Sequence, residues 1–154
     1  MTISEISAIV DRINLELNQN EEKATEGAGL TQQLLSRFID NALLAQNFAY
    51  FNTILFFLKV ARVQIGNVKK TFNNKEFPPD AIATAIEELK TLESLVLEIK
   101  DNLDLSLNRL NSWQDTEAIA ELEEVLEITK ITEQKTRGNC ELSTAIAWKY
   151  QKQI

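Results

Sequence analysis

Apolar residues recur with a period of seven between residues 82 and 113, and this repeat constrains the fold more than any other feature of the sequence. A second set lies three positions after the first, which is the spacing of a helix that packs lengthwise against other helices at a shallow angle. The repeat lasts for about four and a half heptads. The first set is Ile82, Leu89, Val96, Leu103 and Leu110, and the second is Ala85, Leu92, Ile99, Ser106 and Trp113.

The N-terminal region also carries helix signals. Thr2 and Glu5 fit a capping box, in which the threonine side chain accepts a hydrogen bond from the amide three residues later. Gly27 and Gly29 predict the end of this helix, because glycine tolerates the backbone angles of a helix C-cap. Its predicted inner face consists of Ile6, Val10, Ile13 and Leu17.

The segment that precedes the heptad repeat predicts a second helix over residues 31–65, with Gly66 as a candidate end. Pro78 and Pro79 interrupt the apolar pattern, because proline breaks a helix interior. Asp80 is therefore the predicted N-cap of the third helix.

The C-terminal segment predicts a fourth helix, with Asp115 or Thr116 as its N-cap. Its apolar and small residues stay in phase through Gly138, so we expect one long helix with a weak point at that glycine. Small residues and hydroxyls in this stripe favour close helix approach with side-chain bonds to the preceding turn, and the alternative is a partly polar cavity for a small ligand. The stripe is Ala118, Leu122, Val125, Thr129, Thr132, Thr136, Cys140, Ser143, Ala147 and Tyr150.

These segments predict an all-α fold, an antiparallel up-down-up-down four-helix bundle with three long helices and a shorter N-terminal helix. The content of only 4 Gly and 2 Pro in 154 residues argues against a β-rich fold, which would need many turns. The long helices come out at about 50 Å each, and we expect one domain over residues 1–154. Glu93 and Lys100 flank the heptad seam, where charges are expected to set helix pairing. Trp113 and Trp148 are expected at helix ends or at an interface.

The second helix carries two apolar stripes on roughly opposite sides. A membrane span is not expected, because the longest unbroken apolar run covers only residues 54–58. One stripe can enter the bundle core, and the other needs a cover of its own. The first stripe is Leu34, Phe38, Ala45, Ala49, Phe56 and Val63, with Asn52 in its middle. The second, for which we predict a contact with a second copy of the chain, includes Tyr50, Ile54, Phe57, Ala61, Ile65, Val68 and Phe72.

Catalytic chemistry finds little support in the sequence. There is no histidine, which excludes Ser-His-Asp and Cys-His nucleophiles, and the single cysteine, Cys140, excludes a multi-cysteine zinc site. We therefore predict no catalytic residue, cofactor or metal. The alternative is a Mg²⁺-dependent, all-helical nucleotide phosphohydrolase that uses Glu clusters. Its carboxylates would come from Glu117, Glu121 and Glu124 together with Glu87, Glu88, Asp101 and Asp104.

Charge is unevenly placed along the chain. The formal net charge is −7, yet residues 31–75 contain six basic side chains and one acid, Asp40. We expect this basic segment to pack among acidic helices. The alternative is weak nucleic-acid binding, which the acidic remainder of the chain opposes. It would use Lys59, Arg62, Lys69, Lys70 and Lys75.

The sequence thus predicts a non-enzymatic helical bundle that acts by binding protein, with a homodimer through the second helix as the first expectation. Nucleic acid and membrane are not the expected partners. The lone cysteine and the absence of a basic start followed by an apolar run lead us to expect a reducing compartment, the cytoplasm.

Overall fold

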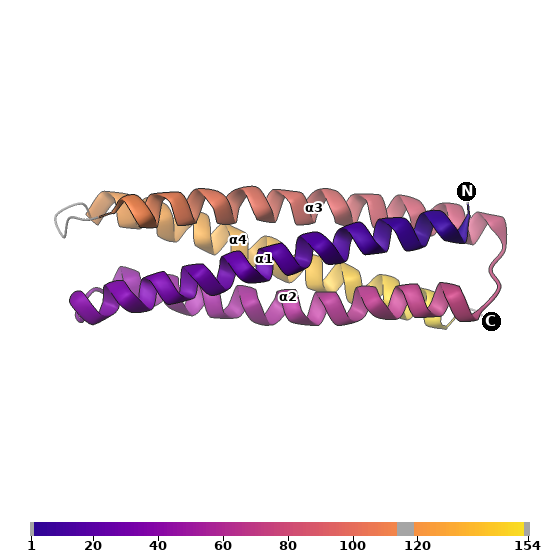
Figure 1. The fold of residues 1–154 in the computed structure, drawn as a ribbon, viewed down its shortest axis with the longest axis horizontal. Coiled ribbons are helices and arrows are strands. Elements are labelled where there is room, and N and C mark those ends of the chain that lie inside the picture. The colour runs from indigo at the N-terminus through magenta and orange to yellow at the C-terminus, as the bar shows by residue number, and fades with distance from the viewer. Residues whose placement is uncertain (1, 114–118, 153–154) are drawn as a thin grey trace.

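The computed structural model describes residues 2–113 and 119–152, and over these residues the chain forms four helices and no strand. α1 spans Ile3–Arg37, α2 spans Ala42–Asn74, α3 spans Pro79–Ser112 and α4 spans Ile119–Gln151. The helices lie side by side as long rods, and α1 begins at the end of the bundle where α4 ends (Figure 1). The predicted all-α four-helix bundle is therefore confirmed.

The helices alternate in direction, but the chain does not pass round the bundle from neighbour to neighbour. Within the described residues, α1 and α4 each contact both α2 and α3, whereas α1 and α4 do not contact each other and neither do α2 and α3. Ion pairs from Arg12 to Glu93 and from Lys23 to Asp104 show that α1 and α3 are parallel neighbours. The connection at residues 75–78 therefore carries the chain across a diagonal of the bundle.

The prediction of a shorter N-terminal helix is wrong. α1 has 35 residues, and it continues through Gly27 and Gly29 to Arg37. The break lies instead at residues 38–41, where the Asn41 side chain caps α2 by accepting a hydrogen bond from the Leu44 amide at 3.1 Å. The second helix accordingly begins at Ala42 and not at residue 31, and it passes Gly66 without interruption.

Gly27 is a glycine because α1 and α2 approach each other closely at that point. A Cβ atom at residue 27 would lie 2.4 Å from the Phe51 ring, and Phe51 is fully buried. The glycine therefore accommodates a core aromatic and does not end a helix. A Cβ at Gly138, inside α4, would meet nothing within 4 Å.

We expect Gly27→Ala to destabilise the fold by about 1–3 kcal/mol, the usual cost of overpacking a core. Gly138→Ala is the matched control and should stabilise by about 0.5–1 kcal/mol, because alanine is the better helix former and the added methyl has room. Urea titrations of both variants measure the two free energies of unfolding. Equal changes in the two variants would show that Gly27 and Phe51 do not pack as described.

The predictions for the third and fourth helices are confirmed with one adjustment. All ten residues of the heptad sets are buried, and so is every described member of the fourth-helix stripe. α4 is one helix through Gly138, whereas Ala118 and the predicted caps Asp115 and Thr116 lie outside the described residues. Pro79 occupies the first position of α3, where a missing N–H costs nothing, so Asp80 lies in the first turn and is not the cap.

Charged pairs at the rims of the helices fix their register. Glu93 accepts hydrogen bonds from Arg12 at 2.8 and 3.1 Å, and Lys100 lies 3.4 Å from Glu16. These are the two α3 residues predicted to set helix pairing. The predicted N-cap of α1 is also present, because the Thr2 hydroxyl accepts a hydrogen bond from the Glu5 amide at 3.4 Å.

Candidate functional site

The two apolar stripes of α2 face the core and the solvent in the reverse of the predicted assignment. Of the seven predicted interface residues, Tyr50 and Phe57 are half-buried and the other five lie in the core of the single chain. The physical reason is the length of α1, which runs beside the whole of α2 and covers the stripe that a shorter helix would leave bare. The five core residues are Ile54, Ala61, Ile65, Val68 and Phe72.

The outward face of α2 is formed by the other stripe. Phe56 and Val63 are each 62% exposed, and Ala45, Ala49 and Asn52, which precede them in the helix, are exposed as well. The Asn52 side chain donates a hydrogen bond to the Phe48 carbonyl of its own helix at 3.1 Å. We call these five residues, together with Val60, the α2 outer face.

The α2 outer face carries no charge over its first half. No charged residue occurs between Asp40 and Lys59, and α2 contains no acid anywhere in its 33 residues. Surface helices of soluble proteins ordinarily cover their outward side with charged and polar residues. A helix that leaves this side apolar is a candidate interaction surface.

A groove between α1 and α2 runs beside this face. It has a volume of about 750 Å³ and is lined by apolar side chains, such as Leu15 and Leu55, and by charges of both signs. Leu15 is 58% exposed. Arg62 crosses the groove to Asn18 at 2.5 Å and to Glu21 at 3.0 Å, so the groove is bridged where the two helices approach.

The basic residues proposed for nucleic-acid binding do not form one strip. Arg62 and Lys69 turn toward α1, where they pair with Glu21 and with Asp11 at 2.7 Å, and Lys75 donates a hydrogen bond to the Gln151 carbonyl at 2.6 Å. The expectation that the basic segment packs against acidic residues of other helices is confirmed for Arg62 and Lys69. Lys59 and Lys70 remain exposed, and Lys59 lines the groove between α1 and α2.

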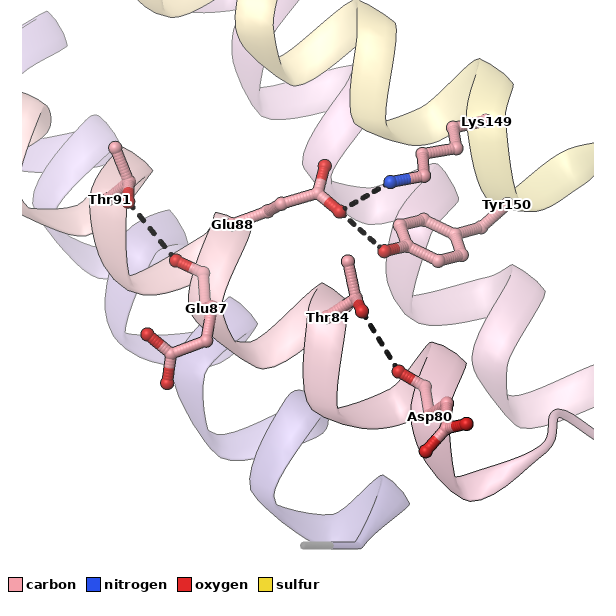
Figure 2. A network of polar contacts seen from close by, with 7 residues as sticks. All are labelled: Asp80, Thr84, Glu87, Glu88, Thr91, Lys149 and Tyr150. Atoms are coloured by element: carbon pink, nitrogen blue, oxygen red, sulfur yellow. Dashed lines mark hydrogen bonds and ion pairs between the residues drawn. The ribbon is translucent and has the colours of Figure 1, made fainter.

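The carboxylates of the metal-site alternative do not converge in the part of the chain that is described. Glu121 and Glu124 are exposed on α4, and Glu124 pairs with Arg109 of α3, whereas Glu117 is not among the described residues. On α3, Glu88 accepts hydrogen bonds from Lys149 at 2.8 Å and from the Tyr150 hydroxyl at 2.6 Å (Figure 2). No group of three or more possible ligands forms among the described residues.

The threonine stripe of α4 bonds back to its own helix, as predicted. The hydroxyls of Thr132 and Thr136 donate to the carbonyls four residues earlier at 2.7 and 2.6 Å. The Thr129 hydroxyl lies 2.8 Å from the Val125 carbonyl oxygen and 2.9 Å from Oδ1 of Asn47 in α2, so its one proton is shared between these two acceptors. Cys140 is buried, and burial is the main cause that raises the pKa of its thiol, which disfavours a reactive thiolate.

Buried amides are the polar residues that the sequence did not reveal. Asn47 is fully buried between α2 and α4, and Asn20 of α1 donates to the Val96 carbonyl of α3 at 3.2 Å. Each lies at a position that the apolar periodicity assigns to the core. An asparagine at such a position is the sequence feature that could have predicted a buried amide. Trp113 packs edge-on against Phe38 at the end of the bundle, with ring centres 5.3 Å apart.

α2 also meets the length and composition of a membrane-spanning helix, and it is the one described helix that does. A core helix of a soluble protein passes the same test. Only 28% of the most apolar 18-residue window is buried in the chain, so most of that window lies at or near the surface. Exposed apolar side chains on this face would be stabilised by a partner that removes them from water.

Comparison of the chain with protein-family models, with curated proteins and with solved structures finds no match.

Proposed function

We propose that the protein is a non-enzymatic interaction module that binds protein through the α2 outer face, and that the occupant of this face is a second copy of the chain. The observation that carries the proposal is the exposure of Phe56 and Val63, each 62%, on a helix face without charge in its first half. Burying a large apolar side chain contributes about 1.5–3 kcal/mol. Removing these side chains from water thus favours association.

A second copy suits this surface because it offers the same uncharged half-helix. Pairing the uncharged halves of two such faces buries apolar and small side chains, including Ala45, Ala49 and Asn52, because no charged residue occurs from residue 41 to residue 58. The small residues allow the two helix backbones to approach closely. Symmetric pairing of one patch with itself is also the commonest way in which soluble chains associate.

The test is a pair of charge substitutions on exposed apolar residues of different helices. Phe56→Glu should convert the dimer to a monomer without loss of helix content, because each copy would place a carboxylate in the apolar contact. Leu105→Glu is the matched control, since Leu105 is 42% exposed on the outside of α3, and it should leave the dimer intact. Sedimentation velocity measures both. Dissociation by both variants, or by neither, would contradict the proposal.

A lipid surface is the alternative partner for an apolar helix face with lysines near it. The wild-type chain and the same two variants distinguish binding to a membrane from self-association. We expect the wild-type chain to stay in solution when it is centrifuged with vesicles that contain anionic lipid. Co-sedimentation of wild type with vesicles, lost in Phe56→Glu and kept in Leu105→Glu, would assign the face to membrane and overturn the proposal of self-association.

A further inference from the structure

Two asparagines in the core each have a side-chain atom without a hydrogen-bond partner among the described residues. Asn20 of α1 and Asn139 of α4 are both fully buried. Nδ2 of Asn20 donates to the Val96 carbonyl at 3.2 Å, and its Oδ1 is unpaired. Oδ1 of Asn139 accepts from the Ser143 hydroxyl at 3.4 Å, and its Nδ2 is unpaired. Buried amide groups without a partner are costly and rare in native proteins.

The contacts between helices place the two asparagines at nearly the same height in the bundle. The height of Asn20 is fixed by its hydrogen bond to Val96 of α3. The height of Asn139 follows from the ion pair between Glu98 of α3 and Lys135 of α4, whose charged atoms lie 3.6 Å apart. Val96 lies two residues before Glu98. Asn139 lies four residues after Lys135, which is a step in the same direction because α3 and α4 run antiparallel. Asn20 and Asn139 therefore lie within about one helical turn, about 5.4 Å, of each other along the bundle.

Both side chains belong to the inner seam of their helix. The seam residues three positions before and four positions after each asparagine are fully buried as well: Leu17, Ala24, Thr136 and Ser143. Since α1 and α4 are not neighbours in the bundle, the two amides approach its central axis from opposite corners. An unpaired acceptor on Asn20 and an unpaired donor on Asn139 thus enter the same level of the core.

Ala61 of α2 provides room at this level. Arg62 pairs at 3.0 Å with the α1 residue that follows Asn20, so Ala61 lies beside Asn20, and it is fully buried. The neighbouring seam positions of α2 carry the larger side chains of Leu58 and Ile65. Because side chains in a core are closely packed, the short alanine leaves space near the axis that a leucine or isoleucine would fill.

We propose that one buried water molecule bridges Asn20 and Asn139 at the centre of the bundle. The water donates a hydrogen bond to Oδ1 of Asn20 and accepts one from Nδ2 of Asn139. Water fits this pair because it both donates and accepts, and internal waters typically bind two to four buried polar groups that lack a protein partner. The bridge joins α1 to α4, two helices that are not neighbours.

NMR of the wild-type chain detects such a water directly. The side-chain amide protons of Asn139 should show cross-peaks to water of opposite sign in NOE and ROE spectra, the signature of a long-lived bound water. Asn47 is the matched control, since it is also fully buried but its Nδ2 donates to the Leu43 carbonyl at 3.0 Å and its Oδ1 lies 2.9 Å from the Thr129 hydroxyl. It should show no such cross-peak. Absence of the cross-peak from Asn139, or equal cross-peaks from both asparagines, would overturn the inference.

A double-mutant cycle tests whether the two amides share one ligand. Asn20→Leu and Asn139→Leu should each lower the melting temperature by about 3–10 °C, because each leaves the other amide without its bridge. The double variant should lose clearly less than the sum of the two losses, since it leaves neither unpaired atom. Additive losses would overturn the inference.

The control cycle combines Asn139→Leu with Asn47→Leu. Asn47 contacts α4 at Thr129, ten residues or about 15 Å from Asn139, so these two losses should add. Coupling of Asn139 to both asparagines would show a general loss of packing and would overturn the inference. So would coupling to Asn20 without the water cross-peak, because it would indicate direct contact between the two amides.

Discussion

Val96→Asp is expected to unfold the chain. Val96 is fully buried in the middle of α3, at a heptad position, and its carbonyl accepts a hydrogen bond from Asn20 of α1. An aspartate at this position would place a carboxylate among the buried apolar side chains of the core. The cost of an unpaired buried charge is several kcal/mol, which is a large part of the roughly 5–15 kcal/mol that stabilises a domain.

The adjacent residue provides the control for this prediction. Leu97 is 42% exposed on the outside of the same helix, so Leu97→Asp makes the same chemical change without burying the charge. Its effect on the free energy of unfolding should remain within about 0.5 kcal/mol. Circular dichroism should show loss of helix for the first variant and native helix content for the second. A folded Val96→Asp chain would contradict the assignment of the heptad seam to the core.

Tyr150→Ala should cost about 3–5 kcal/mol, the usual loss when a buried aromatic is truncated. Tyr150 is fully buried near the end of α4, packs on Phe72 with ring centres 4.9 Å apart, and donates a hydrogen bond to Glu88 at 2.6 Å. Tyr150→Phe keeps the ring and removes only the hydroxyl. It should cost about 1.5–3 kcal/mol, the range for a hydrogen bond to a charged group. Equal losses in the two variants would contradict a role for the ring in packing.

The same tyrosine predicts a dependence of stability on pH. Burial is the main cause that raises the pKa of Tyr150, and the hydrogen bond to Glu88 and the charge of Glu88 raise it further. The unfolded tyrosine titrates at about pH 10. The neutral phenol therefore contributes its full stabilisation below about pH 10 and loses it as the pH rises above that value. The difference in unfolding free energy between wild type and Tyr150→Phe should be constant up to about pH 9 and shrink above about pH 10. A constant difference would contradict this linkage.

The fold could be predicted from the sequence because helix periodicity depends on local order along the chain. The heptad at residues 82–113 and the stripe of α4 each describe one face of one helix, and both faces are buried. Helix ends were less predictable, since Gly27 resembles a C-cap in sequence and is needed for a different reason, the close approach of Phe51. That reason depends on a partner 24 residues away, which no local pattern reports.

The sequence shows that α2 has two apolar stripes, but it does not show which of them faces the solvent. Both apolar stripes of α2 are visible in the sequence, but which one faces the core depends on the length of α1 and on the neighbours of α2 in the bundle. The break between α1 and α2 lies at residues 38–41 and not at residues 27–29, so α1 is longer than predicted. The longer α1 covers Ile65 and Phe72, which are buried in the core. Phe56 and Val63 of the other stripe are exposed.

The mass of the wild-type chain in solution tests the central claim most directly. Light scattering at tens of micromolar should give twice the 17.5 kDa of the single chain, and dilution should lower that value toward one chain. A mass of 17.5 kDa that does not change over the whole concentration range would contradict self-association through the α2 outer face.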